Sequence, residues 1–222
     1  MMTKQLCWMV GGPQGEGIES TGEIFASALN NLGYYLYGYR HFSSRIKGGH
    51  TNNKIRVSTT HVRAIQDDLD ILVAFDQETI DVNFHQLHDK GIVLADAKFS
   101  PTIPDDSSVV LYAVPFTEIA RDLGTTLMKN MVAVGASSAI LQLNVSDFQN
   151  VVQDIFGRKG QKVVENNMKA IEAGYQFVLN EMNGDSKRRL TLEKADGSRR
   201  LFMIGNDALS LGFLAGGCRF MA

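Results

Sequence analysis

The sequence of 222 residues contains only two cysteines, Cys7 and Cys218, and they stand near its opposite ends. Neither belongs to a closely spaced set such as Cys-x-x-Cys, the usual arrangement of protein ligands for zinc and iron–sulfur clusters. A disulfide framework normally uses several cysteines in a short secreted chain, so none is expected here. The sequence therefore predicts neither a disulfide-rich fold nor a metal centre built from this chain alone.

Long apolar runs and a strong excess of charge are also missing. The first apolar run stops at Gly11, which makes it too short for the core of a signal peptide or for a membrane span. With 22 basic and 24 acidic residues, the formal net charge is −2. This balance gives no electrostatic reason to expect nucleic acid or an anionic membrane as a partner. We expect a cytoplasmic protein.

What the sequence does contain is a regular alternation of short apolar runs and amphipathic stretches, with 44% of residues hydrophobic. Apolar runs and period-two alternation predict strands at 6–10, 34–39, 54–58, 71–75, 92–95 and 109–114. Apolar residues at helical spacing predict helices at 18–32, 79–87, 126–141 and 147–182, the last broken near Gly157 and Gly160. Strands alternating with helices predict an α/β fold, whose mostly parallel sheet has helices on both faces.

The composition changes after residue 183. Residues 184–189 are polar and are predicted to be a linker. Beyond them, 190–193 and 200–204 flank a turn and predict a hairpin, and a helix of small residues begins at Gly205. We therefore expect a first domain over 1–183 and the beginning of a second, truncated domain over 190–222.

A glycine-rich turn, Gly11-Gly12-Pro13-Gln14-Gly15-Glu16-Gly17, joins the first strand to the first helix. Such a turn lets N–H groups at the start of a helix approach an anion. It does not end in Gly-Lys-Ser or Gly-Lys-Thr, so it is not a P-loop, and its glycines lack the order Gly-x-Gly-x-x-Gly of dinucleotide sites. Glu16 would oppose a tightly held phosphate. A tight turn without a ligand remains an alternative.

A second polar segment contains Arg45 and Lys47, followed by Gly48, Gly49 and His50. Two cations beside a flexible diglycine suit a loop that closes over a carboxylate or a coenzyme A phosphate, although a solvated connection between strands would look the same. Asn52 adds a neutral donor and acceptor.

Two further features allow other interpretations. Arg40 ends the second predicted strand and would suit the 2′-phosphate of NADP, so an NADP-binding Rossmann-like reductase is one alternative, and a structural docking domain is another. His85 and His88 lie three residues apart on a predicted helix, but no third metal ligand is near, which favours surface histidines.

Three stretches together resemble one family: 12–22, which includes the glycine-rich turn, 38–50, which ends in Arg-Ile-Lys-Gly-Gly-His, and 205–216, Gly-Asn-Asp-Ala-Leu-Ser-Leu-Gly with a later Ala-Gly. Their order and spacing are similar to the alpha subunit of 2-oxoacid:ferredoxin oxidoreductases, especially the 2-oxoglutarate type. There a gamma domain precedes the pyrimidine-side domain for thiamine pyrophosphate. The family usually has glutamine where this chain has Glu16, and the family's later Tyr-Pro-Ile-Thr-Pro segment is absent.

The resemblance implies a Rossmann-like, gamma-type catalytic domain over 1–183, and a start of the thiamine domain over 190–222. It implies a part in coenzyme A-dependent oxidative decarboxylation of a 2-oxoacid, with inactivity of this chain alone. Thiamine pyrophosphate with Mg²⁺ and iron–sulfur clusters would belong to the complete complex and not to this chain. The implied partners are a beta subunit, ferredoxin, the 2-oxoacid and coenzyme A as co-substrate.

No catalytic residue and no metal ligand is carried over from the family. The implied binding residues form two groups near the substrate and coenzyme A. The first group is the loop and the strand after it: Arg45, Lys47, Gly48, Gly49, His50 and Asn52. The second is the glycine-rich turn, with Gly12, Gly15 and Gly17, on the coenzyme A side or at a domain interface.

Overall fold

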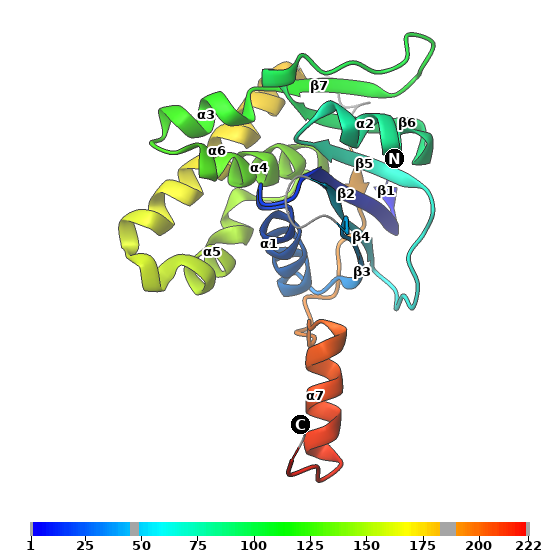
Figure 1. Ribbon diagram of the computed structural model, residues 1–222, viewed down its shortest axis with the longest axis vertical. Coiled ribbons are helices and arrows are strands. Elements are labelled where there is room, and N and C mark those ends of the chain that lie inside the picture. The colour runs from blue at the N-terminus through cyan, green and yellow to red at the C-terminus, as the bar shows by residue number, and fades with distance from the viewer. Residues whose placement is uncertain (1, 45–48, 183–189, 221–222) are drawn as a thin grey trace.

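A computed structural model describes residues 2–44, 49–182 and 190–220 of the chain (Figure 1). Its main sheet has six strands in the order β3-β4-β2-β5-β6-β7. Strands β2, β5, β6 and β7 are parallel to one another, whereas β4 is antiparallel to both β2 and β3. The predicted mostly parallel α/β sheet is confirmed. The strand bounds are β2 (Gln5–Pro13), β3 (Tyr35–His41), β4 (His50–Ser58), β5 (Leu69–Ala74), β6 (Leu87–Asp96) and β7 (Val110–Val114).

The central strands of the sheet are buried on both faces, which is why they are apolar runs. Side chains alternate between faces along a strand. Trp8 of β2 therefore points to one core, where it stacks on Phe25 with ring centroids 4.3 Å apart. Its neighbours Cys7 and Met9 point to the other, smaller core.

Helices cover the two faces unequally (Figure 1). The larger core is covered by α1 (Ile18–Asn31), α3 (Phe116–Asp122), α4 (Lys129–Leu141), α5 (Gln149–Phe156) and α6 (Gln161–Glu181). The smaller one is covered by α2 (Gln77–Asn83) and a 3-10 turn, η1 (Phe84–Gln86). Helix α3 was not predicted, because seven residues are too few to show a helical period. The predicted break falls between α5 and α6, at Gly157–Lys159 and Gly160.

The predicted C-terminal hairpin is wrong. Thr191–Leu192 forms a short strand, β8, that pairs in parallel with β1 (Met2–Thr3) and not with 200–204. The backbone N–H of Glu193 donates to the carbonyl of Thr3 (2.9 Å). The N-terminal residues therefore supply backbone hydrogen bonds that a second hairpin strand would have supplied.

The segment that follows β8 lies against the turn between α1 and β3. The Tyr34 hydroxyl donates to the Glu193 carbonyl (3.0 Å). The Arg200 guanidinium lies 3.9 Å from the Tyr35 ring centroid, pairs with Asp196 (2.6 Å) and donates to the carbonyl of Gly33. Residues 190–200 are therefore held as a strap across the turn between α1 and β3.

The predicted C-terminal helix is confirmed as α7 (Gly205–Ala215), which projects away from the sheet and the other helices (Figure 1). None of its residues is buried, and Leu209 and Leu214 are 61% and 69% exposed. Among the described helices, none combines the length and the apolar character needed to cross a bilayer.

Candidate functional site

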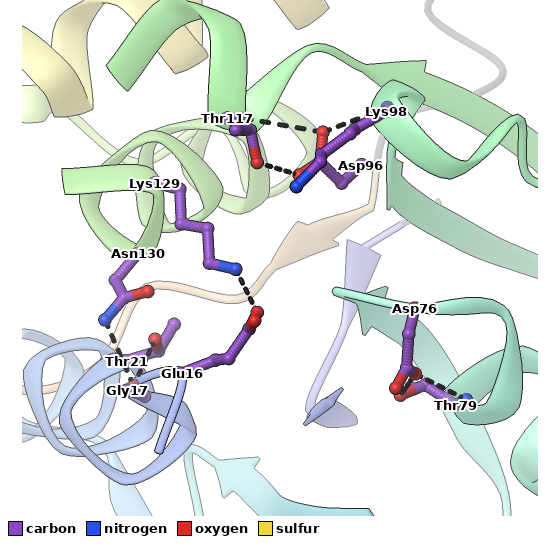
Figure 2. Close-up of polar contacts among 10 residues, drawn as sticks. All are labelled: Glu16, Gly17, Thr21, Asp76, Thr79, Asp96, Lys98, Thr117, Lys129 and Asn130. Carbon is purple, nitrogen blue, oxygen red and sulfur yellow. Dashed lines mark hydrogen bonds and ion pairs between the residues drawn. The ribbon is translucent and has the colours of Figure 1, made fainter. Parts of the chain in front are cut away.

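The carboxyl ends of the parallel strands bring four loops to one edge of the sheet. The turn after β2 lies there with the residues after β5, β6 and β7, including Asp76, Lys98 and Thr117 (Figure 2). From β2 the chain crosses toward β3 and β4, whereas β5, β6 and β7 extend the sheet in the other direction. Ligands of α/β sheets bind outside such a switch point, so this edge is the candidate site.

The glycine-rich turn has the backbone that the sequence predicts. Gly15 and Gly17 have φ angles of 94° and 78°, in the left-handed region that favours glycine. Gly17 is the N-cap of α1, and no side chain caps this helix start. Glycine at position 12 is explained by packing and not by its φ angle, because a Cβ there would lie 2.9 Å from the Cβ of Phe75. The turn thus offers an uncapped helix N-terminus to an anion.

A cavity of about 440 Å³ opens beside this turn. Lys129, at the start of α4, forms an ion pair with Glu16 (Figure 2). Its ammonium lies 4.9 Å from the Phe75 ring centroid. The Asn130 amide donates to the Gly17 carbonyl (3.3 Å). Glu16 is therefore neutralised by Lys129, and its charge does not oppose an anion as the sequence alone suggested.

Two further cations line the same cavity. Lys98 and Arg121 are exposed, and neither forms an ion pair with another residue in the described ranges. Thr117 and Thr126 add hydroxyl groups to the lining. The cavity has three cations and one carboxylate, so its net charge suits a phosphate or a carboxylate.

The buried carboxylate at this edge is structural. Asp96 ends β6 and is 2% exposed. It accepts hydrogen bonds from the Thr117 hydroxyl and from the backbone N–H groups of Thr117 (3.4 Å) and Lys98 (3.2 Å), as Figure 2 shows. With its oxygens already used, Asp96 joins the loops after β6 and β7 and is not a free acid or base.

The second predicted segment lies next to the turn. The carbonyl of Gly49 accepts a hydrogen bond from the Gln14 N–H (2.9 Å), and His50 pairs with Pro13 in the β2–β4 register. The structure thus brings Gly49, His50 and Asn52 to the same edge as Gly12, Gly15 and Gly17. Arg45, Lys47 and Gly48 lie outside the described residues.

His50 is half-buried, and burial lowers its pKa, while the carboxylates of Asp76 and Glu78 act in the opposite direction and His41 acts in the same direction as burial. Its Nε2 lies 3.3 Å from the Asn83 Nδ2 and 3.5 Å from the Asn52 Nδ2. His50 is therefore neutral near pH 7 and bound to amide groups rather than to carboxylates.

The other polar candidates lie elsewhere. Arg40 lines a separate cavity of about 600 Å³ beside α1 and residues 201–206. His85 and His88 do not share a helix, which corrects the prediction: His85 is in the η1 turn and His88 is in β6, where its Nε2 lies 2.9 Å from Asp70. In the described part of the chain, no three His, Cys, Asp or Glu side chains gather as metal ligands would.

Sequence reasoning missed Lys98, Arg121 and Lys129, because each comes from a different element and none belongs to a local motif. One rule could have found Lys98 and Thr117. Both follow the ends of predicted parallel strands, where ligand-binding residues of α/β sheets gather.

Comparison with known proteins identifies the family. Residues 7–177 match the family described as pyruvate ferredoxin/flavodoxin oxidoreductase. A 2-oxoacid:ferredoxin oxidoreductase alpha subunit from Sulfolobus sp. is 26% identical over 98% of this chain and 40% of its own length. The chain thus spans about two fifths of that relative.

Two solved structures are similar to this one. The 2-oxoglutarate:ferredoxin oxidoreductase from Magnetococcus marinus, with 2-oxoglutarate, coenzyme A and succinyl-CoA bound, has a TM-score of 0.87 and 28% identity over 97% of this chain and 38% of that one. A keto/oxoacid ferredoxin oxidoreductase gamma subunit from Geobacter sulfurreducens has a TM-score of 0.66 and 22% identity over 79% of this chain and 99% of that one. The second likeness concerns the fold alone.

Proposed function

The chain belongs to the pyruvate ferredoxin/flavodoxin oxidoreductase family. On that premise we propose that it belongs to a 2-oxoglutarate-type 2-oxoacid:ferredoxin oxidoreductase, where it helps to form the path by which the substrate and coenzyme A reach the thiamine site. The reaction is the coenzyme A-dependent oxidative decarboxylation of the 2-oxoacid, with ferredoxin as electron acceptor. The observation that carries the proposal is the cavity beside the glycine-rich turn, which is lined by an uncapped helix start and three cations and so suits an anion.

The binding roles follow the two groups of residues at this edge. Gly12, Gly15 and Gly17 allow the backbone of the turn to come close to coenzyme A. Gly49, His50 and Asn52 extend the site onto β4. Arg45 and Lys47, with Gly48 beside them, would bind phosphate or carboxylate oxygens. The bound ligands named for the Magnetococcus marinus structure support this assignment.

The cofactors belong to the rest of the complex. Thiamine pyrophosphate with Mg²⁺ needs a set of oxygen ligands, and iron–sulfur clusters need several cysteine thiolates. The whole chain has two cysteines, and the residues described here include no group of metal-ligating side chains. We propose that a beta subunit and the remaining part of the alpha subunit hold these groups and perform the electron transfer.

The proposed domain division places a gamma-type domain at 1–183, a linker at 184–189 and the start of the thiamine domain at 190–222. The gamma subunit from Geobacter sulfurreducens supports this division, because 79% of this chain covers 99% of that separate chain. The strap 190–200 would then be the point where the second domain attaches to the first.

The direct test is Lys47→Ala in the assembled complex. Loss of a charge-assisted bond to a bound anion costs about 1.5–3 kcal/mol, so kcat/KM for coenzyme A or the 2-oxoacid should fall roughly 10- to 150-fold. Lys90→Ala is the matched control, because Lys90 is exposed on β6 before its buried part, at the other end of the strand from the site. Values within twofold of the wild type for both ligands would contradict the role of the loop. Stabilisation of the chain by NADPH in a thermal shift assay would favour the reductase alternative.

A further inference from the structure

Three polar residues alternate along one face of β4: His50, Asn52 and Lys54. Lys54 is only 5% exposed, although lysine is almost never buried without partners. Its ammonium donates to the Asp67 carbonyl (2.6 Å) and to the Gln86 Oε1 (3.0 Å). An ammonium has donors only, so Lys54 fixes which end of the Gln86 amide is the oxygen.

That orientation is passed on to Asn83. The Gln86 Nε2 donates to the Asn83 Oδ1 (3.1 Å). On the other side, the Asn83 Nδ2 donates to the Thr79 carbonyl (2.9 Å), and a carbonyl can only accept. Asn83 is 2% exposed and is therefore oriented by two independent contacts, which removes the usual ambiguity between amide oxygen and nitrogen.

The oriented amide determines the proton of His50. The Asn83 Nδ2 lies 3.3 Å from the His50 Nε2, so the imidazole nitrogen is the acceptor. A neutral imidazole has one donor and one acceptor nitrogen, which places its proton on Nδ1. A charged ring would bring a second N–H against the Asn83 amide, in agreement with the lowered pKa that burial gives His50.

The remaining N–H of His50 has no acceptor. Nδ1 is buried, and no atom of the described residues accepts from it. An unmade hydrogen bond of this kind costs about 1–3 kcal/mol, so a missing acceptor is expected. The ring lies beside the glycine-rich turn, because a Cβ on Gly11 would lie 3.1 Å from the His50 Cε1.

We propose that Asn83 holds His50 as the neutral Nδ1-protonated tautomer, and that this N–H is reserved for an oxygen of the ligand that binds at the turn. The second half rests on the proposed function. His50 is then a hydrogen-bond donor and not a general base, and Asn83 is a positioning residue that acts through it. The acceptor is a carboxylate or phosphate oxygen, which the 2-oxoacid and coenzyme A respectively would supply.

The tautomer can be read from two-bond ¹H–¹⁵N correlations of the ring in the full 222-residue chain. His50→Gln identifies the signals of His50 among those of the five histidines. The wild type should show a protonated Nδ1 and an unprotonated Nε2. Asn83→Asp removes the donor, so Nε2 should become protonated. A protonated Nε2 in the wild type overturns the proposal, and this result does not depend on whether Asn83→Asp folds. A folded Asn83→Asp protein whose His50 is still protonated on Nδ1 alone also overturns it.

Asn167→Asp is the matched control. Asn167 is also buried in a helix, 6% exposed, and its Nδ2 donates to the carbonyl four residues earlier, that of Val163 (2.7 Å). The same exchange should therefore cost similar stability while leaving the His50 tautomer unchanged. A change of tautomer in this control would mean that loss of stability, and not the Asn83 contact, controls the ring.

Coenzyme A and 2-oxoglutarate, added separately, test the second half. A downfield shift of the His50 Nδ1–H with coenzyme A identifies a phosphate oxygen, and a shift with 2-oxoglutarate identifies a carboxylate or keto oxygen. No shift with either ligand, while calorimetry still measures coenzyme A binding, overturns the reserved donor. Absence of any binding, with the Nδ1–H tautomer intact, contradicts the proposed function and leaves the role of Asn83 standing.

Discussion

At the scale of single residues, the charge at the glycine-rich turn depends on neighbours that are distant in sequence. Glu16 lies one residue before the N-cap of α1, and a carboxylate near this end is favourable to the helix dipole. Lys129, 113 residues later, forms an ion pair with it and is largely covered, with 14% of its side chain exposed. The exposed cations Lys98 and Arg121 therefore determine the sign of the net charge of the cavity.

Lys98→Ala is therefore expected to weaken coenzyme A binding. Lys98 is exposed, so its contribution is about 1 kcal/mol, or roughly fivefold in Kd, and it should shrink as salt is raised. Calorimetric titrations of the complex at low and high ionic strength measure both effects. Lys90→Ala should leave Kd unchanged, and an equal loss in that control would show that only the overall charge matters.

Cys7 provides a prediction about pH. Burial raises the pKa of its thiol to about 11, from 9.0, because the thiolate would be desolvated. As pH rises, the Cys7 thiol of the unfolded chain loses its proton before that of the folded chain. The contribution of this thiol to the free energy of unfolding is therefore largest below pH 9 and is lost as pH rises from about 9 to 11. The loss is on the order of 2 kcal/mol. Urea unfolding of the wild type and of Cys7→Ala at pH 8 and 10.5 should show a smaller loss in the variant, and parallel losses would assign the effect to other groups.

At the scale of elements, the contact between α4 and α6 depends on two glycines. A Cβ on Gly135 would lie 1.8 Å from the Ile171 carbonyl oxygen, and one on Gly174 would lie 2.0 Å from that of Val132. These atoms belong to helix backbones and cannot move as a side chain does. The two helices can approach this closely only because both positions lack a side chain.

Gly135→Ala should accordingly destabilise the fold by about 3 kcal/mol or more, at the upper end for overpacking. The loss would be measured as a lower urea midpoint. Gly212→Ala is the control, because Gly212 lies within α7 and has no neighbouring atom within 4 Å of the added Cβ. That change should leave the main transition where it is. A Gly135→Ala protein as stable as the control would mean that the helices separate easily.

Most elements were predictable because each one has a local signal. The apolar runs at 71–75 and 92–95 gave strands, and Gly157 and Gly160 marked the break between two helices. The hairpin failed because the partner of 191–192 is the N-terminal Met2–Thr3, which no local pattern indicates. The prediction that His85 and His88 share a helix failed for another reason: the boundary between η1 and β6 falls between the two residues.

At the scale of the whole molecule, the site is a product of topology. The glycine-rich turn and Gly49-His50 were each predicted as binding segments, but their contact depends on the antiparallel pairing of Pro13 with His50. The cations of the cavity lie in three different elements, so the sequence could not show that they meet. The resemblance to a family led to the proposed function, whereas the composition alone gave no reason to expect certain classes of partner.

We expect the isolated chain to have no oxidoreductase activity, because the thiamine and cluster sites are proposed to lie in the rest of the complex. The chain spans 40% of its Sulfolobus relative and 38% of the Magnetococcus marinus chain. Viologen reduction would be assayed with 2-oxoglutarate, thiamine pyrophosphate, Mg²⁺ and coenzyme A, with the assembled complex as positive control. Reduction above the background of the mixture without protein would contradict the assignment.

We expect the strap 190–200 to stabilise the residues that precede it and α7 to add nothing to their stability, and truncation separates the two contributions. A chain that ends at Arg200 keeps the ion pair of Arg200 with Asp196 and its stacking on Tyr35. It loses residues 201–204 and α7, none of which is buried. Such a chain should therefore melt at the same temperature as the full chain.

A chain that ends at Met182 should be less stable, because it also loses β8 and the strap. Leu192 is 7% exposed, so its removal costs about 2 kcal/mol of apolar burial. The Tyr34 hydroxyl and the Thr3 carbonyl lose their partners on Glu193, which adds about 1 kcal/mol. Together these losses correspond to roughly 6–12 °C in melting temperature for a chain of this size. Calorimetric melting of the three lengths measures this directly. Equal melting of the Met182 and Arg200 forms would mean that the strap adds no stability to the preceding residues, and a lower value for the Arg200 form than for the full chain would mean that the residues after Arg200 also stabilise them.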